Sequence, residues 1–136
     1  MDELVKAMLR ETQARTAYLE HETIDTIYFG GGTPSLLPTD DIHRILDTVA
    51  KFYTVNSQAE VTLEANPDDL TYLKILELAR TAVNRLSIGI QSFRNEDLVW
   101  MNRAHNASQA DYAVKCSQDR GFNNITISMV VGPQPC

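Results

Sequence analysis

The chain has 136 residues, with 12 lysines and arginines against 18 aspartates and glutamates, so its formal net charge is −6. A content of 43% hydrophobic and 22% charged residues is ordinary for one globular domain, and the acidic balance argues against a nucleic-acid partner. The sequence holds no apolar run of roughly 20 residues that could span a membrane and no secretory signal after Met1, so the cytoplasm is the expected location.

The first half of the chain carries two helical patterns separated by a strand pattern. Residues 2–20 place apolar side chains at spacings of three and four, which predicts a helix. Residues 24–29 are rich in β-branched and aromatic side chains and stop at three glycines, which predicts a strand followed by a tight turn. Thr39 and the two aspartates after it indicate a helix start, and the apolar spacing continues this helix to Phe52.

The second half repeats the order of strand and then helix. The elements predicted there are a strand at 60–64, a helix at 71–80, a strand at 85–90, a short helix capped by Asn95, a helix from Ser108 to Arg120 that stops at Gly121, and a strand at 124–131. Strands that alternate with helices predict parallel pairing through right-handed crossovers.

The side chains along these strands favour a curved sheet over a doubly wound one. In 60–64, 85–91 and 124–129, apolar residues alternate with small or polar ones. A sheet covered on both faces would carry continuously apolar strands. One apolar face for the helices and one polar concave face fit an incomplete TIM-like β/α barrel, of which four strands form only a sector.

Several polar or glycine positions are predicted at the C-terminal ends of the strands, where parallel α/β folds bind ligands. The positions are glycines 30–32 after the first strand, Glu64 at the end of the second, Gln91 after the third, Ser128 on the polar face of the fourth, and Arg103 in a following loop. Bare glycine backbone can approach a ligand closely, carboxylate and amide groups accept or donate hydrogen bonds, and arginine suits a carboxylate. Together they predict a zwitterionic or nucleoside-like ligand.

Each of these residues also has an ordinary structural explanation. Three glycines are most often a tight turn, and Glu64 and Arg103 taken singly would be solvated charges. The glycine run matches neither the dinucleotide motif nor the P-loop. The remaining expectations concern residues without an assigned role: surface positions for His21, His43 and His105, and packed positions for Trp100, Met101 and Cys116.

No catalytic residue or metal ligand is assigned from the sequence. The three histidines match no metal-binding spacing. Cys116 and Cys136 are the two cysteines of the chain, too few for a disulfide framework, a four-cysteine zinc site or an iron–sulfur site.

Residues 27–35, Ile-Tyr-Phe-Gly-Gly-Gly-Thr-Pro-Ser, resemble the glycine motif of radical S-adenosylmethionine (SAM) enzymes, and more narrowly the oxygen-independent coproporphyrinogen III oxidase family. Residues 64–67 (Glu-Ala-Asn-Pro), 85–93, 102–105 (Asn-Arg-Ala-His) and 121–125 follow in the order and spacing of that family. The resemblance covers nearly the whole chain. It implies that residues 1–136 form a single, partial radical SAM core domain.

The resemblance implies SAM and a [4Fe–4S] cluster as cofactors, with reductive cleavage of SAM to a 5′-deoxyadenosyl radical. The residues that would contact SAM by this resemblance are Gly31, Gly32 and Thr33 on its methionine part, together with Glu64, Gln91 and Arg103. Ser128 stands where the family usually has a SAM-contacting aspartate. The three cluster cysteines of the family, spaced C-x-x-x-C-x-x-C, have no counterpart here, so we expect this chain to lack the cluster-binding segment. We also expect it to lack the C-terminal part of the longer family protein, called the parent below. The chain alone is therefore expected to be catalytically inactive.

By this resemblance the parent oxidatively decarboxylates coproporphyrinogen III to protoporphyrinogen IX in porphyrin biosynthesis. Residues 64–67 and Gln91-Ser92-Phe93 also favour a first alternative, the HemW-like branch, whose members are taken to be haem chaperones. A second alternative is a plain nucleotide-binding α/β module with a sheet covered on both faces. The expected partners are SAM and a porphyrinogen or haem, and a barrel sector with uncovered edges is expected to self-associate.

Overall fold

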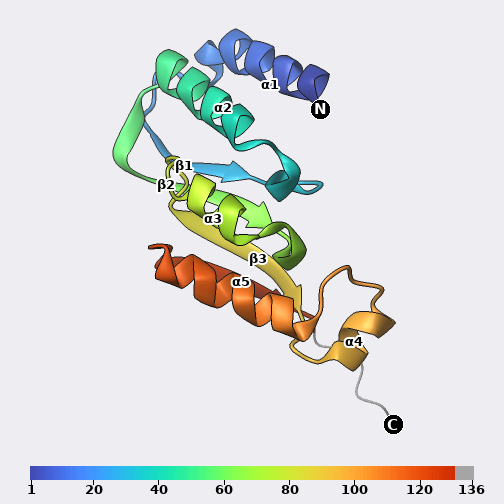
Figure 1. Ribbon diagram of the computed structural model, residues 1–136. Coiled ribbons are helices and arrows are strands. Elements are labelled where there is room, and N and C mark those ends of the chain that lie inside the picture. The colour runs from blue at the N-terminus through green and yellow to red at the C-terminus, as the bar shows by residue number, and fades with distance from the viewer. Residues whose placement is uncertain (131–136) are drawn as a thin grey trace.

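The computed structural model describes residues 1–130 and shows four strands that alternate with helices along the chain (Figure 1). The helices are α1 (Asp2–Ala14), α2 (Thr39–Phe52), α3 (Tyr72–Leu78), α4 (Asn95–Trp100) and α5 (Ala107–Asp119), and the strands are β1 (Ile24–Phe29), β2 (Val55–Ala65), β3 (Arg85–Gln91) and β4 (Asn124–Met129). Short 3₁₀ turns lie at Thr16–Leu19, Pro34–Leu36 and Pro67–Asp69. Among residues 1–130, no helix is long and apolar enough to cross a membrane.

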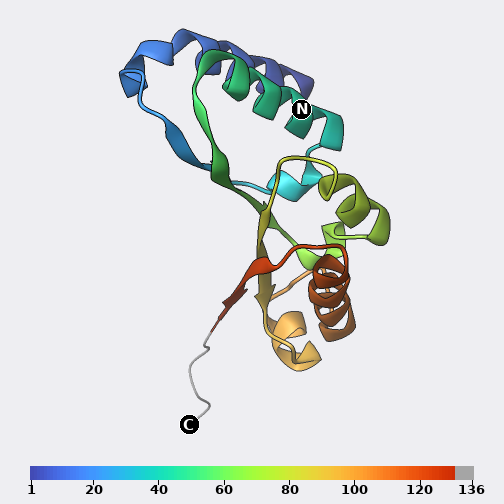
Figure 2. The ribbon, with the colours of Figure 1, turned by 90° about the vertical axis from the view of Figure 1, so that its left-hand side faces the viewer.

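The strands form one parallel sheet in the order β1-β2-β3-β4. In its centre, Leu63 of β2 pairs with Phe29 of β1 and with Leu86 of β3. The long helices lie on one side of this sheet, and its other face is open (Figure 2). This arrangement confirms the predicted sector of a β/α barrel. The two-sided sheet of the nucleotide-binding alternative is therefore wrong for residues 1–130.

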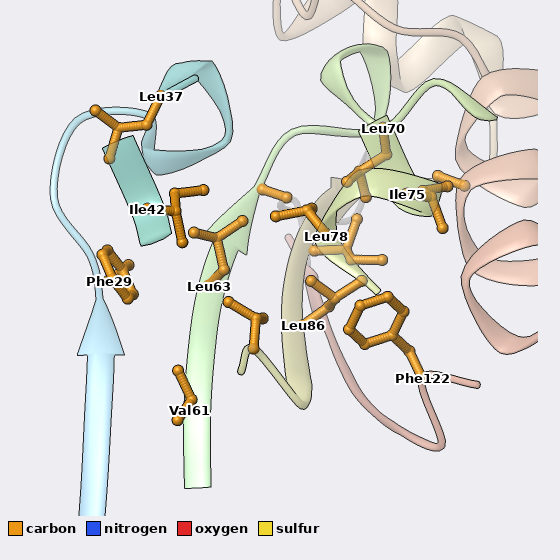
Figure 3. Packing of buried hydrophobic residues seen from close by; sticks show 14 of the residues in the cluster. Phe29, Leu37, Ile42, Val61, Leu63, Leu70, Ile75, Leu78, Leu86 and Phe122 are labelled. Atoms are coloured by element: carbon orange, nitrogen blue, oxygen red, sulfur yellow. The ribbon is translucent and has the colours of Figure 1, made fainter. Parts of the chain in front are cut away.

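The predicted alternation along the strands decides which side chains enter the core (Figure 3). Val61 and Leu63 of β2 are 4% and 0% exposed, and Leu86 of β3 is fully buried. They pack against buried side chains of the helices, which are Val5 of α1, Ile42, Ile45 and Leu46 of α2, Ile75 and Leu78 of α3, and Ala110, Ala113 and Cys116 of α5. Burying these side chains supplies most of the driving force for folding, at about 25 cal/mol for each Å² of apolar surface.

The first residues of α5 differ from the prediction, which placed Ser108 at the cap. Asn106 is the N-cap: its side chain accepts a hydrogen bond from the Gln109 backbone N–H at 2.8 Å, and the Gln109 side chain accepts one from the Asn106 backbone N–H at 2.9 Å. This capping box satisfies two backbone donors at once, so it prevails over a single serine cap. Asn95 does not cap its own helix either. Its side chain accepts a hydrogen bond from the Ala107 N–H at 2.8 Å and so joins the start of α4 to the start of α5.

At two other helix ends the structure agrees more closely with the prediction. Gly121 follows α5 with φ +96°, and the next N–H, of Phe122, donates to the Ser117 carbonyl at 3.0 Å, as in a Schellman motif. Thr39 is the first residue of α2, but its hydroxyl donates to the Glu77 carboxylate at 3.0 Å and does not cap the helix. The predicted fourth strand ends at Met129 in the structure, and Val131 lies outside the described residues.

The burial of Cys116 and Trp100 can be compared with the expectation that both side chains pack in the interior. Cys116 is buried, as predicted. Trp100 is 76% exposed, so the expectation that it packs is wrong. Helix α4 has only six residues, and it buries Leu98 and leaves the neighbouring Val99 and Trp100 facing outward. Self-association of the sheet edges stays a prediction.

Replacing Leu63 by alanine tests whether the central strand carries the core. We expect the free energy of unfolding to fall by about 2–5 kcal/mol, because the side chain is completely buried and its removal leaves a cavity. Urea unfolding followed by circular dichroism measures the change. In the matched variant Leu73→Ala, the lost side chain is 62% exposed, and the change is expected to stay within about 0.5 kcal/mol. Equal losses in the two variants would contradict this assignment of the core.

Candidate functional site

A cleft of about 260 Å³ opens at the C-terminal ends of the four strands. It is lined by Gly32, Thr33 and Pro34 after β1, Glu64, Ala65 and Asn66 at the end of β2, Ser87, Gly89 and Gln91 of β3, Arg103 after α4, and Ser128 of β4. The structure thus brings together all the predicted site residues except Gly30 and Gly31. Their common position follows from the parallel sheet, which collects the ends of all four strands on one edge.

Gly31 lies beside the cleft, in the wall of an apolar cavity of about 550 Å³ between α1 and the segment that joins β1 to α2. Gly31 and Gly32 have φ values of +75° and +52°, in the left-handed region that glycine adopts without steric cost. The added Cβ of alanine would meet no atom within 4 Å at either position. Glycine is therefore needed at these positions for the backbone conformation of the turn. The turn brings Gly32 and Thr33 to the cleft.

Glu64 is held by a residue that the sequence analysis did not select. The Tyr28 hydroxyl donates a hydrogen bond to Glu64 Oε1 at 2.7 Å, and this bond raises the pKa of Tyr28, because the carboxylate favours the neutral phenol. A Cβ on Gly30 would come within 2.8 Å of the Tyr28 ring, so the first glycine of the run leaves room for this ring. The alternation along β1 could have identified Tyr28, since it points to the polar face like Glu64.

Gln91 has a strained backbone at the end of β3. Its φ is +71°, and the Ser92 N–H donates to the Ile90 carbonyl at 2.9 Å, so these three residues form a γ-turn of the rare positive-φ type. The Gln91 carbonyl accepts a hydrogen bond from the Val130 N–H at 2.9 Å, after a shift in the register between β3 and β4. Strain of this kind persists only where the surroundings hold the residue in place.

Arg103 enters the cleft from the end of α4. Asn102 follows the helix in the left-handed region with φ +55°, and the Arg103 N–H donates to the Leu98 carbonyl at 2.9 Å, which completes a Schellman motif. The Arg103 Nη2 atom reaches Asn66 Oδ1 and the Gly89 carbonyl, each only at 3.4 Å. The Nε atom is buried and has no hydrogen-bond partner among residues 1–130. The guanidinium therefore keeps unused donors, which suit a ligand carboxylate.

Gly89 and Asn66 complete the site and were not selected from the sequence. A Cβ on Gly89 would lie 3.2 Å from Gln91 Nε2 and 3.8 Å from both Arg103 Nη2 and Asn66 Oδ1. Because glycine stands there, the three polar side chains converge over bare backbone. Gly89 lies on the polar face of β3, between Ser87 and Gln91, and this parity is the signal that could have identified it.

The histidines form no metal site in the part of the chain that the structure describes, where no group of three or more potential metal ligands occurs. The expectation that His105 lies at the surface is wrong, because it is only 4% exposed. Its Nε2 atom is 2.7 Å from the Ile90 carbonyl oxygen, within the γ-turn of Gln91. A buried hydrogen bond to a strand end explains this position, and the spacing of the histidines gave no sign of it.

Comparison with known proteins relates this chain to one family. The family model of the Radical SAM superfamily matches residues 4–135. The chain is 38% identical over 130 residues to the heme chaperone HemW of Lactococcus lactis, covering 96% of this chain and 33% of the relative. It is 34% identical over 131 residues to the heme chaperone HemW of Escherichia coli, covering 96% and 35%. The chain thus spans about a third of the length of the curated relatives it matches.

Solved structures show the same fold. Coproporphyrinogen III oxidase (HemN) from Escherichia coli, a radical SAM enzyme, superimposes with a TM-score of 0.85 at 24% identity over 94% of this chain and 30% of the oxidase. The archaeal Elp3 of Methanocaldococcus infernus gives a TM-score of 0.70 at 20% identity over 90% of this chain and 33% of that protein. At these identities the likeness concerns the fold.

The hydrogen bond between Tyr28 and Glu64 predicts that the Tyr28 hydroxyl has a raised pKa and that this pKa depends on Glu64. We expect Tyr28 to ionise above the ordinary pH range of tyrosine, and Glu64→Gln to bring its pKa back towards that range. NMR of the ¹³C-labelled tyrosine rings measures this, with Tyr28→Phe to assign the signal. Since the folded pKa is raised, the stability that the bond contributes is present below the unfolded pKa and is lost as the pH rises through the folded one. An ordinary Tyr28 pKa in the wild type would contradict the bond.

Proposed function

This chain belongs to the radical SAM superfamily, and we propose that the cleft at its strand ends binds S-adenosylmethionine. The observation that carries the proposal is the buried Nε of Arg103, which has no partner in the described part of the chain and lies in the same cleft as the Glu64 carboxylate. A zwitterionic ligand that bears a carboxylate and an ammonium group matches this pair of charges. The methionine part of SAM is such a group.

Each site residue selected from the sequence has a role in this proposal that its chemistry supports. Arg103 offers its free donors to the methionine carboxylate. Glu64 accepts from an ammonium group or from ribose hydroxyls, and Gln91 both donates and accepts. Gly31, Gly32 and Thr33 present backbone N–H and C=O groups, with Gly32 and Thr33 directly on the cleft. Ser128 supplies a short neutral hydroxyl where the family usually places an aspartate. When bound, SAM supplies radical chemistry by its reductive cleavage.

The residues of this chain do not fit a [4Fe–4S] cluster. Three cysteines at the family spacing are not in the sequence, and Cys116 is buried in the core between α5 and the sheet. We therefore assign this chain the binding and orientation of SAM. An iron–sulfur cluster in the whole protein would need ligands other than these residues.

For the whole protein we propose a role in handling haem, as a HemW-like chaperone. The supporting observation is the identity of 38% and 34% to two proteins named heme chaperone HemW, over nearly the full length of this chain. The likeness to coproporphyrinogen III oxidase rests on 24% identity, which concerns the fold. The comparisons therefore favour the chaperone alternative over the oxidative decarboxylation that the family resemblance implies.

Isothermal titration of this chain with SAM tests the proposed cleft. We expect saturable binding, and a loss of about tenfold or more in affinity for Arg103→Met, which removes a charge-assisted hydrogen bond. Arg80→Met is the matched control, because Arg80 is exposed and lines a separate cavity near the start of α2. Equal affinity of the wild type and Arg103→Met, or no binding by the wild type, would contradict the proposal.

Two optical assays on the protein that contains this sequence separate the haem proposals. A chaperone is expected to shift the Soret band of added haem and to leave coproporphyrinogen III unchanged. An oxidase would convert coproporphyrinogen III to protoporphyrinogen IX, which is seen after oxidation as the fluorescence of protoporphyrin. Turnover without stable haem binding would overturn the chaperone role.

A further inference from the structure

His105 makes a buried hydrogen bond next to the cleft. The ring is 4% exposed, and Nε2 lies 2.7 Å from the Ile90 carbonyl oxygen. A carbonyl oxygen accepts hydrogen bonds and never donates them, so Nε2 carries the proton. The other nitrogen, Nδ1, is buried and has no hydrogen-bond partner among the described residues. The bond to Ile90 is thus the polar contact that orients this ring.

The carbonyl that His105 binds is the one that closes the γ-turn. Ile90 accepts at the same oxygen from the Ser92 N–H at 2.9 Å, and Gln91 is the strained residue between them. A γ-turn of this type is intrinsically unfavourable and needs support from its surroundings. A second donor on the closing carbonyl supplies that support from outside the strand.

The same side chain also anchors the segment that carries Arg103. His105 follows Arg103 by two residues in the connection from α4 to α5, and Asn106 begins α5 with its capping box. The Arg103 backbone is fixed at its other side by the bond to Leu98. Binding of His105 to Ile90 therefore holds this connection against the end of β3, where Arg103 Nη2 reaches the Gly89 carbonyl.

We propose that His105 is a positioning residue that fixes Gln91 and Arg103 at their places in the cleft through one buried hydrogen bond to the γ-turn. This inference rests on the proposed binding of SAM for its effect on affinity. Its structural content, the coupling of the connection after α4 to the turn after β3, stands apart from the identity of the ligand.

Three variants of this chain separate positioning from general stability. His105→Leu removes the donor and keeps an apolar side chain. His105→Gln keeps an N–H donor on a side chain of similar reach. Ile75→Val is the matched control, because it deletes one methyl group from a fully buried side chain of α3 that does not line the cleft.

In titrations with SAM, we expect His105→Leu to lose about tenfold in affinity, the factor that corresponds to leaving a buried hydrogen bond unmade. His105→Gln is expected to recover most of this loss. Ile75→Val is expected to lower the unfolding temperature and to bind SAM like the wild type. Wild-type affinity in His105→Leu, or an equal loss in His105→Gln and His105→Leu, would overturn the proposal.

NMR of the ligand-free chain gives a readout that does not depend on SAM. Long-range ¹⁵N–¹H spectra are expected to show His105 as the Nε2–H tautomer. The Ser92 amide and the Arg103 Nε–H signals are expected to shift in His105→Leu and to stay in place in Ile75→Val. An Nδ1–H tautomer in the wild type would overturn the proposal even if His105→Leu does not fold. If the wild type shows these signals but binds no SAM, the proposed function fails and the positioning role stands.

Discussion

The strict alternation of side chains between the two faces of a strand governs this structure. Val61 and Leu63 point to the helices, and the residues between and after them, Thr62 and Glu64, point to the open face. Because the pairing of all four strands is parallel, the alternation also brings their polar C-terminal residues to one edge. A shift of one residue in the register of β2 would bury Glu64 and expose Leu63, so the core and the cleft depend on the same register.

The open face of the sheet is polar, but it is not simply solvated. Thr62 is only 1% exposed and accepts a hydrogen bond from Arg85 Nη1 at 3.3 Å, and Arg85 also donates to the Thr126 hydroxyl. Nearer the cleft, Tyr28 bonds Glu64 across two strands. These links between neighbouring strands stiffen the floor under the cleft. They keep polar groups paired on a face that no helix of the described chain covers.

The elements and the edge of the sheet that holds the site could be predicted from the sequence, since both depend on local patterns. Strand β1 was predicted with its observed ends. Glu64 and Gln91 were selected from strand parity and strand ends, and Arg103, in a following loop, from the fit of its guanidinium to a carboxylate. The partners of these residues could not be predicted in the same way. Tyr28 meets Glu64 across 36 positions of sequence, and no local pattern records that contact.

A choice between two possible helix caps and one contact between separate segments explain the remaining differences between prediction and structure. Ser108 and Asn106 are both good caps, and the choice depends on Gln109 reaching back to the Asn106 backbone, which doubles the number of donors satisfied. His105 was expected at the surface because its spacing to the other histidines matches no metal site, and a histidine without such a role is usually exposed. Its burial depends on the end of β3, 15 positions earlier, which lies against this connection in the folded chain.

Residues with positive φ lie in three connections at the cleft, next to the side chains proposed to bind the ligand. Gly31 and Gly32 turn the chain after β1, Gln91 at the end of β3, and Asn102 after α4. Glycine and asparagine adopt this region readily, whereas a glutamine does so only under constraint. The energy for that constraint must come from contacts already made, namely the bonds of His105 and Ser92 to Ile90 and that of Val130 to Gln91. A cleft whose polar side chains are held in advance loses less entropy when a ligand binds. The strain at Gln91 is thus consistent with the proposed SAM site, in which the lining side chains would be held in place before the ligand binds.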